Sequence, residues 1–373
     1  MIFAENSFDY FISTINKKRL IAFGASSYLQ NICKPYPELN LANNIECIVD
    51  NDPKKWNGIY TLDGKEIPIY APTFFEKEPN NSFTIIISSC EYSYDIWKQL
   101  DLIPNLKDVE CFVLPLLISE HSDNDSFEFK SESYGIIPKI IHCFWFSKSE
   151  KDKLSKMCLE SWKKTNPDFE IKEWNSDNYD IEKNNYMKKA YENRKWAFVT
   201  DYARMDVINQ YGGFYFDLDV ELYKSLNEIR NHKMVIGFGV DRGIEGAAFG
   251  AQKKCNIVCE MLDIYENLEF DLERIEKGEI QPFFLSKIFI NNGFLLNGKL
   301  QEKDGICLLP KEYFSNKDFL SGIIKKEICS IGVHHYASGW KDEKTREHEN
   351  RRMKQINLIK KEYYNTNSKR EKK

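Results

Sequence analysis

Three carboxylates stand at every second position directly after a pair of glycines, in the run YGGFYFDLDVEL at residues 211–222. They are Asp217, Asp219 and Glu221, and the alternate positions carry apolar side chains: Phe214, Phe216, Leu218, Val220 and Leu222. Because successive side chains point to opposite faces of a strand, the spacing predicts one apolar face and one acidic face. Short aspartates on a rigid strand end suit a hard divalent cation. A metal site is therefore one interpretation, and a D-x-D that arose by chance is the other.

The segment before the glycines carries a second pair of candidate residues. In KWAFVTDYARMDVINQYGG, apolar side chains recur at spacings of three and four, which predicts a helix that ends at Gly212. Asp201 and Arg204 project from one side of that helix. A carboxylate accepts hydrogen bonds and a guanidinium donates a fixed fork, so the pair could serve a binding site. The alternative is a surface ion pair that stabilises the helix little.

The length, net charge and composition of the chain argue against several classes of protein. A length of 373 residues fits two domains with cores of their own. The net charge of −5 argues against the broad basic surface of a nucleic-acid-binding protein. No run approaches the roughly 18 apolar residues of a membrane span. The ten scattered cysteines and a start without a leader pattern predict a reducing, cytoplasmic location.

Apolar runs and polar gaps predict the domain organisation. Residues 1–120 alternate strand-like and helical segments, which predicts a small Rossmann-like α/β domain with a parallel sheet. Residues 121–135 are polar and acidic, as a linker would be. Residues 136–345 form the second domain, and residues 346–373 are a charged helix or tail.

The first domain departs from the dinucleotide-binding fingerprint. Gly24 ends its first strand, but Ser26 and Tyr28 stand near where further glycines would approach a pyrophosphate. The sequence therefore favours a scaffold or an oligomerisation module over a cofactor site. The stretches FGAS, CIVDNDPKKWNG and DGKEIPIYAP also resemble the small Rossmann-like domains attached to bacterial sugar-modifying and polysaccharide-assembly enzymes.

Four motifs in a fixed order resemble one known family across residues 136–340: IPKIIHCFWF, SWKKTNPDFEIKEWN, the segment from the helix to the carboxylates, and IGVHHYASGW. The order resembles the DXD-containing sugar glycosyltransferases of glycosyltransferase family 32 and the catalytic domain of large clostridial glucosylating toxins. The resemblance implies a GT-A fold, a Rossmann-like α/β domain with a mixed sheet that binds a nucleotide sugar. It also implies Mn²⁺, or Mg²⁺, on the diphosphate of a donor for which a UDP-linked sugar is favoured.

The same resemblance implies roles for single residues. Asp219 would ligate the cation directly, and Asp217 would contact the ribose and the water shell of the metal. Asp201 and Arg204 would hold the hydroxyls of the donor sugar. Trp145, in the opening strand, would stack on the nucleotide base, and a tryptophan of the core is the alternative.

The C-terminal motif HHYASGW would supply the last contacts. Ser338 and Trp340 match the toxin-like spacing, in which the serine touches metal and diphosphate and the tryptophan touches the diphosphate. His335 replaces an acidic metal ligand of that pattern, which favours Mn²⁺ because imidazole is a poorer ligand for Mg²⁺. His334 is expected to face the other way, and Glu221 to support the site from outside. The small-residue run at 243–258 and Gln281 are weaker candidates for the acceptor side of the cleft.

The resemblance also implies retention of the anomeric configuration. Together these features predict a metal-dependent hexosyltransferase that acts on a glycan acceptor in capsule, lipooligosaccharide or other surface polysaccharide synthesis. The basic tail could bind an anionic membrane and so bring the protein to a lipid-linked acceptor. The first domain could form an oligomer. The sequence does not identify the donor base, the sugar, the linkage or the oligomeric state. Three alternatives stay open: a nicotinamide-dependent sugar-modifying enzyme that uses the first domain, a non-catalytic scaffold that binds a nucleotide sugar, and a protein-directed glucosyltransferase.

Overall fold

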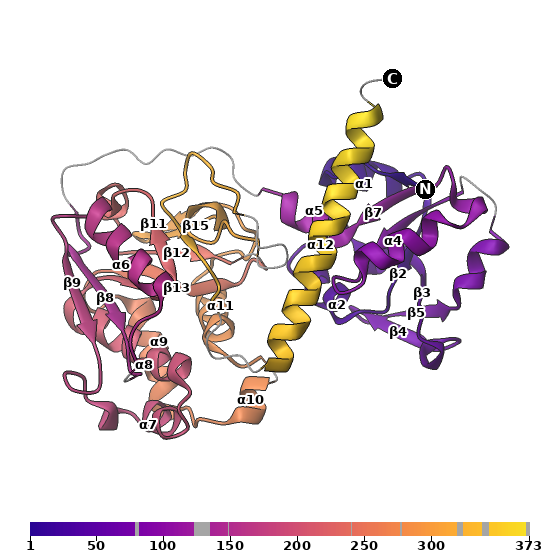
Figure 1. Cartoon of the computed structure of the whole chain (residues 1–373). Helices are drawn as coiled ribbons and strands as arrows, with labels where there is room; N and C mark the ends of the chain where they lie inside the picture. Colours follow the sequence, from indigo (N-terminus) through magenta and orange to yellow (C-terminus); the bar gives the residue numbers. More distant parts are fainter. Residues whose placement is uncertain are drawn as a thin grey trace. The chain divides into compact units, whose positions relative to one another are not determined.

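The computed structural model describes residues 1–78, 82–122, 135–147, 149–239, 241–276, 278–318, 324–337 and 343–370. Contacts within the chain define two compact units (Figure 1). Unit 1 consists of Met1–Ser122, Phe319–Gly322 and Asp342–Lys373, and unit 2 of Asp123–Asp318 and Ile323–Lys341. The predicted linker, residues 121–135, lies almost wholly outside the described residues, so the predicted domain boundaries stay a prediction.

Unit 1 is built on a seven-stranded sheet in the order β1-β7-β6-β2-β3-β5-β4. Its strands are β1 (Ile2–Phe3), β2 (Arg19–Phe23), β3 (Ile45–Val49), β4 (Ile59–Leu62), β5 (Lys65–Tyr70), β6 (Phe83–Ile87) and β7 (Glu110–Val113). All neighbours are parallel except β4 and β5. Chain order runs one way from β2 through β3 to β5 and the other way from β6 to β7, so the topology switches between β2 and β6.

Helices cover both faces of this sheet. They are α1 (Phe8–Ile15), α2 (Ser27–Cys33), α3 (Leu41–Asn44), α4 (Ser93–Asp101), α5 (Leu114–Glu120) and α12 (Glu343–Arg370). All five residues of β6 are buried, as expected for a parallel strand between two layers of helices. The C-terminal segment, predicted as a charged helix or tail, is α12, which contacts α4, α5 and β1. Ile356 and Ile359 are its buried apolar anchors.

Unit 2 has a mixed seven-stranded sheet in the order β14-β15-β12-β13-β10-β8-β9. Its strands are β8 (Ile140–Phe144), β9 (Glu170–Trp174), β10 (Gly213–Phe216), β12 (Met234–Phe238), β13 (Ile244–Ala251), β14 (Gln301–Lys303) and β15 (Ile306–Leu309). β10 is parallel to β8 and antiparallel to β13. A second, two-stranded sheet pairs β11 (Val220–Leu222) with β16 (Gly332–His334).

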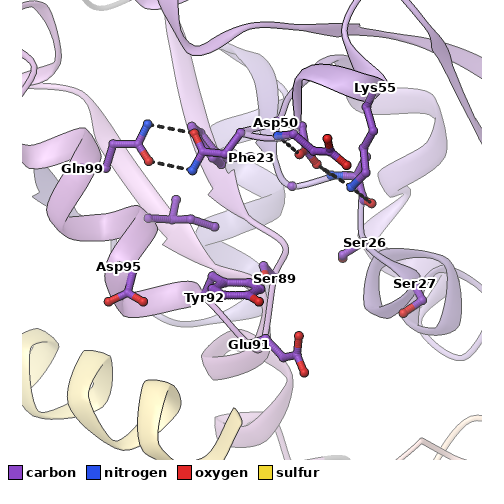
Figure 2. A pocket seen from close by; sticks show the side chains of 15 residues that line it. Phe23, Ser26, Ser27, Asp50, Lys55, Ser89, Glu91, Tyr92, Asp95 and Gln99 are labelled. Carbon is purple, nitrogen blue, oxygen red and sulfur yellow. Dashed lines mark hydrogen bonds and ion pairs between the residues drawn. The ribbon is translucent and has the colours of Figure 1, made fainter. Parts of the chain in front are cut away.

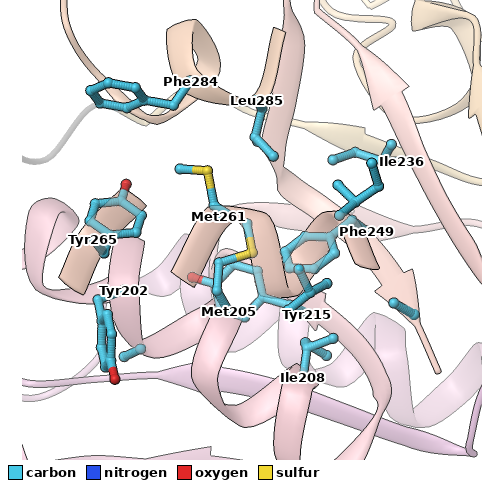
Figure 3. Close-up of a cluster of buried hydrophobic side chains, with 14 of the residues drawn as sticks. Tyr202, Met205, Ile208, Tyr215, Ile236, Phe249, Met261, Tyr265, Phe284 and Leu285 are labelled. Carbon is cyan, nitrogen blue, oxygen red and sulfur yellow. The ribbon is translucent and has the colours of Figure 1, made fainter. Parts of the chain in front are cut away.

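The helices of unit 2 are α6 (Lys153–Thr165), α7 (Asn185–Glu192), α8 (Trp196–Tyr211), α9 (Asn256–Asn267), α10 (Leu272–Glu276) and α11 (Gln281–Asn291). Helix α8 lies deepest, with ten of its residues buried. Figure 3 shows its side chains Met205 and Ile208 among Tyr215, Phe249 and Met261 in one apolar cluster. The central helix that carries the predicted sugar-binding pair is therefore held by packing on most of its surface. Among the described residues, none of the helices combines the length and apolarity that crossing a membrane requires.

The carboxylate segment is not the continuous strand that the alternation predicts. β10 ends at Phe216, and a turn closed by the amide of Val220 donating to the carbonyl of Asp217 at 3.0 Å leads into β11. The continuous strand was the wrong prediction because β11 leaves the central sheet to pair with β16. The apolar side of the alternation survives, since Phe214, Phe216 and Leu218 all pack in one cluster.

Two glycines set the geometry between α8 and β10. Gly212 ends the helix with φ +64°, as the sequence predicts, and Gly213 follows with φ +108°. A Cβ at Gly213 would lie 2.6 Å from the carbonyl oxygen of Ile140 on β8. Glycine is required here both by the backbone angle and by the approach of the neighbouring strand.

We predict that Gly213→Ala lowers the free energy of unfolding by at least about 2 kcal/mol, because it adds a backbone clash to an unfavourable φ. Chemical denaturation measures this. Gly278→Ala is the matched control, since Gly278 has φ +88° but no atom within 4 Å of its Cβ position. A loss at Gly213 no larger than at Gly278 would contradict the clash.

Candidate active site

The carboxyl ends of β8 and β10 define one edge of the sheet in unit 2. The register pairs Phe214 with Ile141 and Tyr215 with His142, so Asp217, just past β10, lies level with the end of β8. Trp145 follows β8, and its amide donates to the carbonyl of Trp174 at 2.9 Å. The topology thus brings Asp217 and Trp145, which are far apart in the chain, to the same edge.

Helix α8 delivers Asp201 and Arg204 to this edge. Both side chains are buried, so the sequence alternative of a surface ion pair is wrong. Arg204 Nη2 lies 2.9 Å from Asp201 Oδ1, and Nη1 lies 3.6 Å from Asp217 Oδ1. The guanidinium also packs 4.8 Å from the centre of the Tyr215 ring, whose hydroxyl donates to Asp217. Arg204 therefore joins the helical acid to the first aspartate of the D-x-D.

Most donors of Arg204 are engaged within the protein. Nε and Nη2 donate to the carbonyl and the hydroxyl of Thr200, and Nη1 donates to the carbonyl of Gly246 at 2.8 Å. Burial is the main factor that raises the pKa of Asp201 to about 6, and the charge of Asp217 adds to it, whereas Arg204 opposes it. The carboxylates of Asp201 and Asp217 thus flank the buried guanidinium of Arg204.

Asp219 lies beside a histidine on β16. His334 Nε2 is 3.4 Å from Asp219 Oδ1, and the amide of Ala337 donates to Asp219 Oδ2 at 2.8 Å. Although burial opposes ionisation, the charge of His334 and these hydrogen bonds lower the pKa of Asp219 to about 2. Burial also disfavours the charged imidazole, yet Asp219 and Glu245 hold the pKa of His334 well above its ordinary value. The second aspartate of the D-x-D thus sits in a place that favours positive charge.

Three potential metal ligands converge here. Asp217, Asp219 and His334 each offer an atom, and these atoms lie within 4.8 Å of one another. The sequence predicted His335 as the metal ligand and His334 on the opposite side. His335 directly follows β16, and its Nε2 lies 3.0 Å from Glu221 Oε2 instead of joining the group of converging ligand atoms. Glu221, expected to support the site from outside, is the partner of that second histidine.

A carboxylate behind His334 was missed in the sequence. Glu245 Oε1 lies 3.5 Å from His334 Nδ1, and Glu245 also accepts hydrogen bonds from Ser315 and Tyr336. The signal for it in the sequence was the small-residue run GIEGAAFG, in which Glu245 is the one charged side chain and is therefore a candidate functional residue. Nothing local, however, pointed to a histidine 89 positions later, the difference between 334 and 245.

The remaining predicted residues fall in different places. Trp145 is half-buried, and its Nε1 donates to the carbonyl of Ser149 at 2.8 Å. Gln281 is buried, and its Nε2 donates to the backbone carbonyl of Asp201 at 2.9 Å. Its amide therefore braces helix α8 from α11. Ser338 and Trp340 lie outside the described residues.

Part of unit 2, including the residues at this edge of the sheet, is similar to a known protein family. Residues 152–236 match a family model described as a glycosyltransferase sugar-binding region containing a DXD motif, and that segment includes Asp201, Arg204, Asp217 and Asp219. No curated protein is significantly similar to the chain. One solved structure, named PaToxG Glycosyltransferase, is 16% identical with a TM-score of 0.33, over 42% of this chain and 69% of that one. A structural similarity at this score supports no conclusion about the fold or function of this chain.

The family match supports a role in glycosyl transfer for unit 2. The predicted fold class is confirmed in its architecture: unit 2 is a mixed α/β domain, consistent with a GT-A-type fold, and unit 1 is a separate α/β unit with a mainly parallel sheet. The finer resemblance, to glycosyltransferase family 32 and to clostridial toxins, stays a prediction.

We predict that Arg204→Lys lowers the free energy of unfolding by about 2 kcal/mol or more, because an ammonium cannot reproduce the fork to Thr200, Asp201 and Gly246. Thermal and chemical unfolding measure this. Arg194→Lys is the control, since Arg194 is exposed in the same unit and should tolerate the change. Equal stability of the two variants would mean that the buried fork contributes nothing to folding.

Proposed function

We propose that the chain is a metal-dependent, retaining glycosyltransferase. It transfers a hexose from a nucleotide sugar, with UDP-linked donors favoured, to a glycan acceptor in capsule, lipooligosaccharide or other surface polysaccharide synthesis. One observation carries the proposal: the segment that matches a DXD sugar-binding region places its two aspartates against a histidine, with ligand atoms within 4.8 Å.

The donor set fits a divalent first-row cation. Two carboxylate oxygens and one imidazole nitrogen suit Mn²⁺ better than Mg²⁺, which prefers oxygen ligands alone. His334 Nδ1 is buried and makes no hydrogen bond to the described residues, while Glu245 stands 3.5 Å behind it. A carboxylate behind a ligating histidine fixes the orientation of the ring and its tautomer. We therefore assign His334, rather than His335, as the nitrogen ligand beside Asp217 and Asp219, with the cation replacing the proton that these carboxylates favour on its imidazole.

The bound cation would supply the positive charge that stabilises the departing nucleoside diphosphate. The chain's own residues do the rest in this proposal. Tyr215 and Arg204 orient the carboxylate of Asp217 by a hydrogen bond and a charge, and Asp201 meets the hydroxyls of the donor sugar. Arg204 does more to position the site than to bind the sugar, since four of its hydrogen bonds are internal. Ser338 and Trp340 are proposed to contact the diphosphate.

The proposed transfer is a front-face displacement. The bond from the anomeric carbon to the diphosphate oxygen breaks as the acceptor hydroxyl oxygen bonds to the same face of that carbon. The proton of the hydroxyl passes to an oxygen of the leaving phosphate. Retention of configuration then needs no covalent enzyme intermediate, which agrees with a sequence in which no isolated carboxylate presents itself as a nucleophile.

The proposed setting is the cytoplasm. The basic tail would bring the enzyme to the inner face of a membrane and to a lipid-linked acceptor, and unit 1 would serve oligomerisation. Vesicle flotation and light scattering test these two points separately from catalysis.

We predict that the protein hydrolyses one nucleotide sugar slowly in Mn²⁺, and that EDTA abolishes the reaction. Asp219→Ala should lower kcat/KM by at least about a hundredfold, because the cation then loses a direct ligand. Asp263→Ala is the matched control, since Asp263 is exposed on α9 in the same unit. Undiminished turnover by the Asp219 variant, or by the wild type in EDTA, would remove the metal from the mechanism.

We predict that Trp145→Ala weakens nucleotide binding by about 1 to 3 kcal/mol if the indole stacks on the base. Trp145→Phe should keep most of the affinity, because a phenyl ring still offers a stacking face. Calorimetric titration with the nucleoside diphosphate measures both. Unchanged affinity in the alanine variant, with reduced thermal stability, would assign Trp145 to packing instead.

A further inference from the structure

A cavity of about 620 Å³ opens in unit 1, at the carboxyl ends of β2, β3 and β6 (Figure 2). Gly24 follows β2, Asp50 follows β3 and Ser89 lies just past β6. The topology of the sheet switches between β2 and β6, and open α/β sheets bind their ligands in the crevice at such a switch point. The volume falls within the range of small-molecule sites. Neither the metal cluster nor the transfer reaction of unit 2 uses this cavity.

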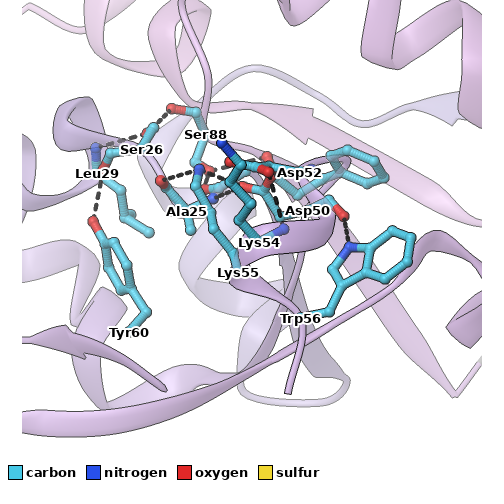
Figure 4. Close-up of polar contacts among 12 residues, drawn as sticks. Ala25, Ser26, Leu29, Asp50, Asp52, Lys54, Lys55, Trp56, Tyr60 and Ser88 are labelled. Carbon is cyan, nitrogen blue, oxygen red and sulfur yellow. Dashed lines mark hydrogen bonds and ion pairs between the residues drawn. The ribbon is translucent and has the colours of Figure 1, made fainter. Parts of the chain in front are cut away.

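The lining of the cavity is strongly acidic. Asp50, Asp52, Glu91 and Asp95 contribute carboxylates, against a single ammonium from Lys55. That ammonium is already engaged, because its Nζ lies 3.0 Å from Asp50 Oδ2 and donates to the carbonyl of Ala25 at 3.1 Å (Figure 4). A phosphate placed here would meet more negative charge than positive charge.

The turn between β2 and α2 is closed by its own hydrogen bonds. Ser26 Oγ accepts from the amide of Leu29 and donates to the carbonyl of Ser88 at 2.8 Å, and the Tyr60 hydroxyl donates to the carbonyl of Ser26 at 2.6 Å (Figure 4). Asp50 Oδ2 accepts from the amide of Ala25 at 2.7 Å. Two backbone amides of this turn, those of Ala25 and Leu29, are thus already hydrogen-bonded within the protein. These contacts argue against the nicotinamide-dependent alternative.

Other features of the cavity suit a neutral ring with hydroxyl groups. The carboxylates of Asp52, Glu91 and Asp95 can accept hydrogen bonds from hydroxyls, and Ser27 and Ser89 add hydroxyls of their own. Tyr92 is 45% exposed and borders the cavity beside Ile96, so its ring offers a flat apolar face. A base or the C–H face of a sugar packs well on such a ring.

Helix α12 holds the rim in place. Gln355 Nε2 donates to Asp95 Oδ2 at 2.9 Å, and Gln355 Oε1 accepts from the amides of Tyr94 and Asp95. Arg351 Nη1 donates to the Tyr92 hydroxyl at 3.1 Å, and His348 pairs with Glu91. Three acidic or aromatic rim residues are therefore ordered without a ligand, which lowers the entropic cost of binding one.

We propose that this cavity binds a neutral sugar ring that carries vicinal hydroxyls, as found in the ribose of a nucleoside or in a hexoside. The carboxylates accept from the diol, and Tyr92 covers the apolar face of the ligand. Phosphorylated forms bind more weakly because the acidic lining repels them. The site is separate from the proposed transfer reaction and does not require a metal.

The test is calorimetric titration of the full chain in EDTA, which removes any metal-dependent binding at unit 2. The probes are uridine, adenosine and methyl hexosides, with inorganic pyrophosphate and NAD as anionic comparators. We expect saturable binding of at least one neutral probe, and its identity distinguishes a nucleoside source from a glycoside source. The same affinity should appear in Asp219→Ala, so failure of the transfer proposal and failure of this one are distinguishable.

Variants at the rim locate the binding. Tyr92→Ala and Asp52→Asn should each weaken it about tenfold. Tyr70→Ala and Asp63→Asn are the matched controls, since both residues lie in unit 1 outside the cavity lining and should leave the affinity unchanged. Absence of binding by every neutral probe up to millimolar concentration would overturn the proposal. So would equal affinity in the rim variants, or pyrophosphate or NAD binding more tightly than the neutral probes.

Discussion

The buried guanidinium of Arg204 connects the elements that carry the candidate site of unit 2. It joins α8 to Asp217 after β10 and to the carbonyl of Gly246 on β13, while its face packs on Tyr215. Removing one partner of a buried charge leaves the other uncompensated, so such a group tolerates little change. The position of the D-x-D is consequently tied to the helix before it. The glycine pair makes this geometry reachable, because only residues that accept positive φ can turn the chain so sharply from α8 into β10.

Local signals made much of this unit predictable. The apolar period of α8 and its end at Gly212 are encoded within twenty residues or so, and the family-like order of motifs pointed to Asp201, Arg204, Asp217 and Asp219 together. The break at residues 217–219 was not predictable in the same way, because it depends on β11 finding β16 late in the chain. Alternation correctly separated apolar from acidic positions without showing where the strand would stop.

The orientation of the two adjacent histidines is a second feature that the sequence could not predict. His334 and His335 are neighbours, so composition and spacing treat them almost alike. Which of them faces the aspartates is decided by the pairing of Val220 with His334 across two short strands. A shift of register by one residue would exchange the faces, and each strand is only three residues long, so the register depends on the pairing of two segments far apart in the chain. In unit 1, Gly24 and Asp50 could be placed at strand ends, but the cavity arises only when β6 and α4 close beside them.

The central claim is that a cation binds between Asp217, Asp219 and His334. Electron paramagnetic resonance of Mn²⁺ measures this directly, through the free and bound populations in matched variants of the two histidines. The account predicts that His334→Ala loses Mn²⁺ affinity at least about tenfold, the order expected for a ligand or its partner, and that His335→Ala keeps the wild-type affinity. Loss of affinity in the His335 variant alone, or unchanged affinity in both, would contradict it.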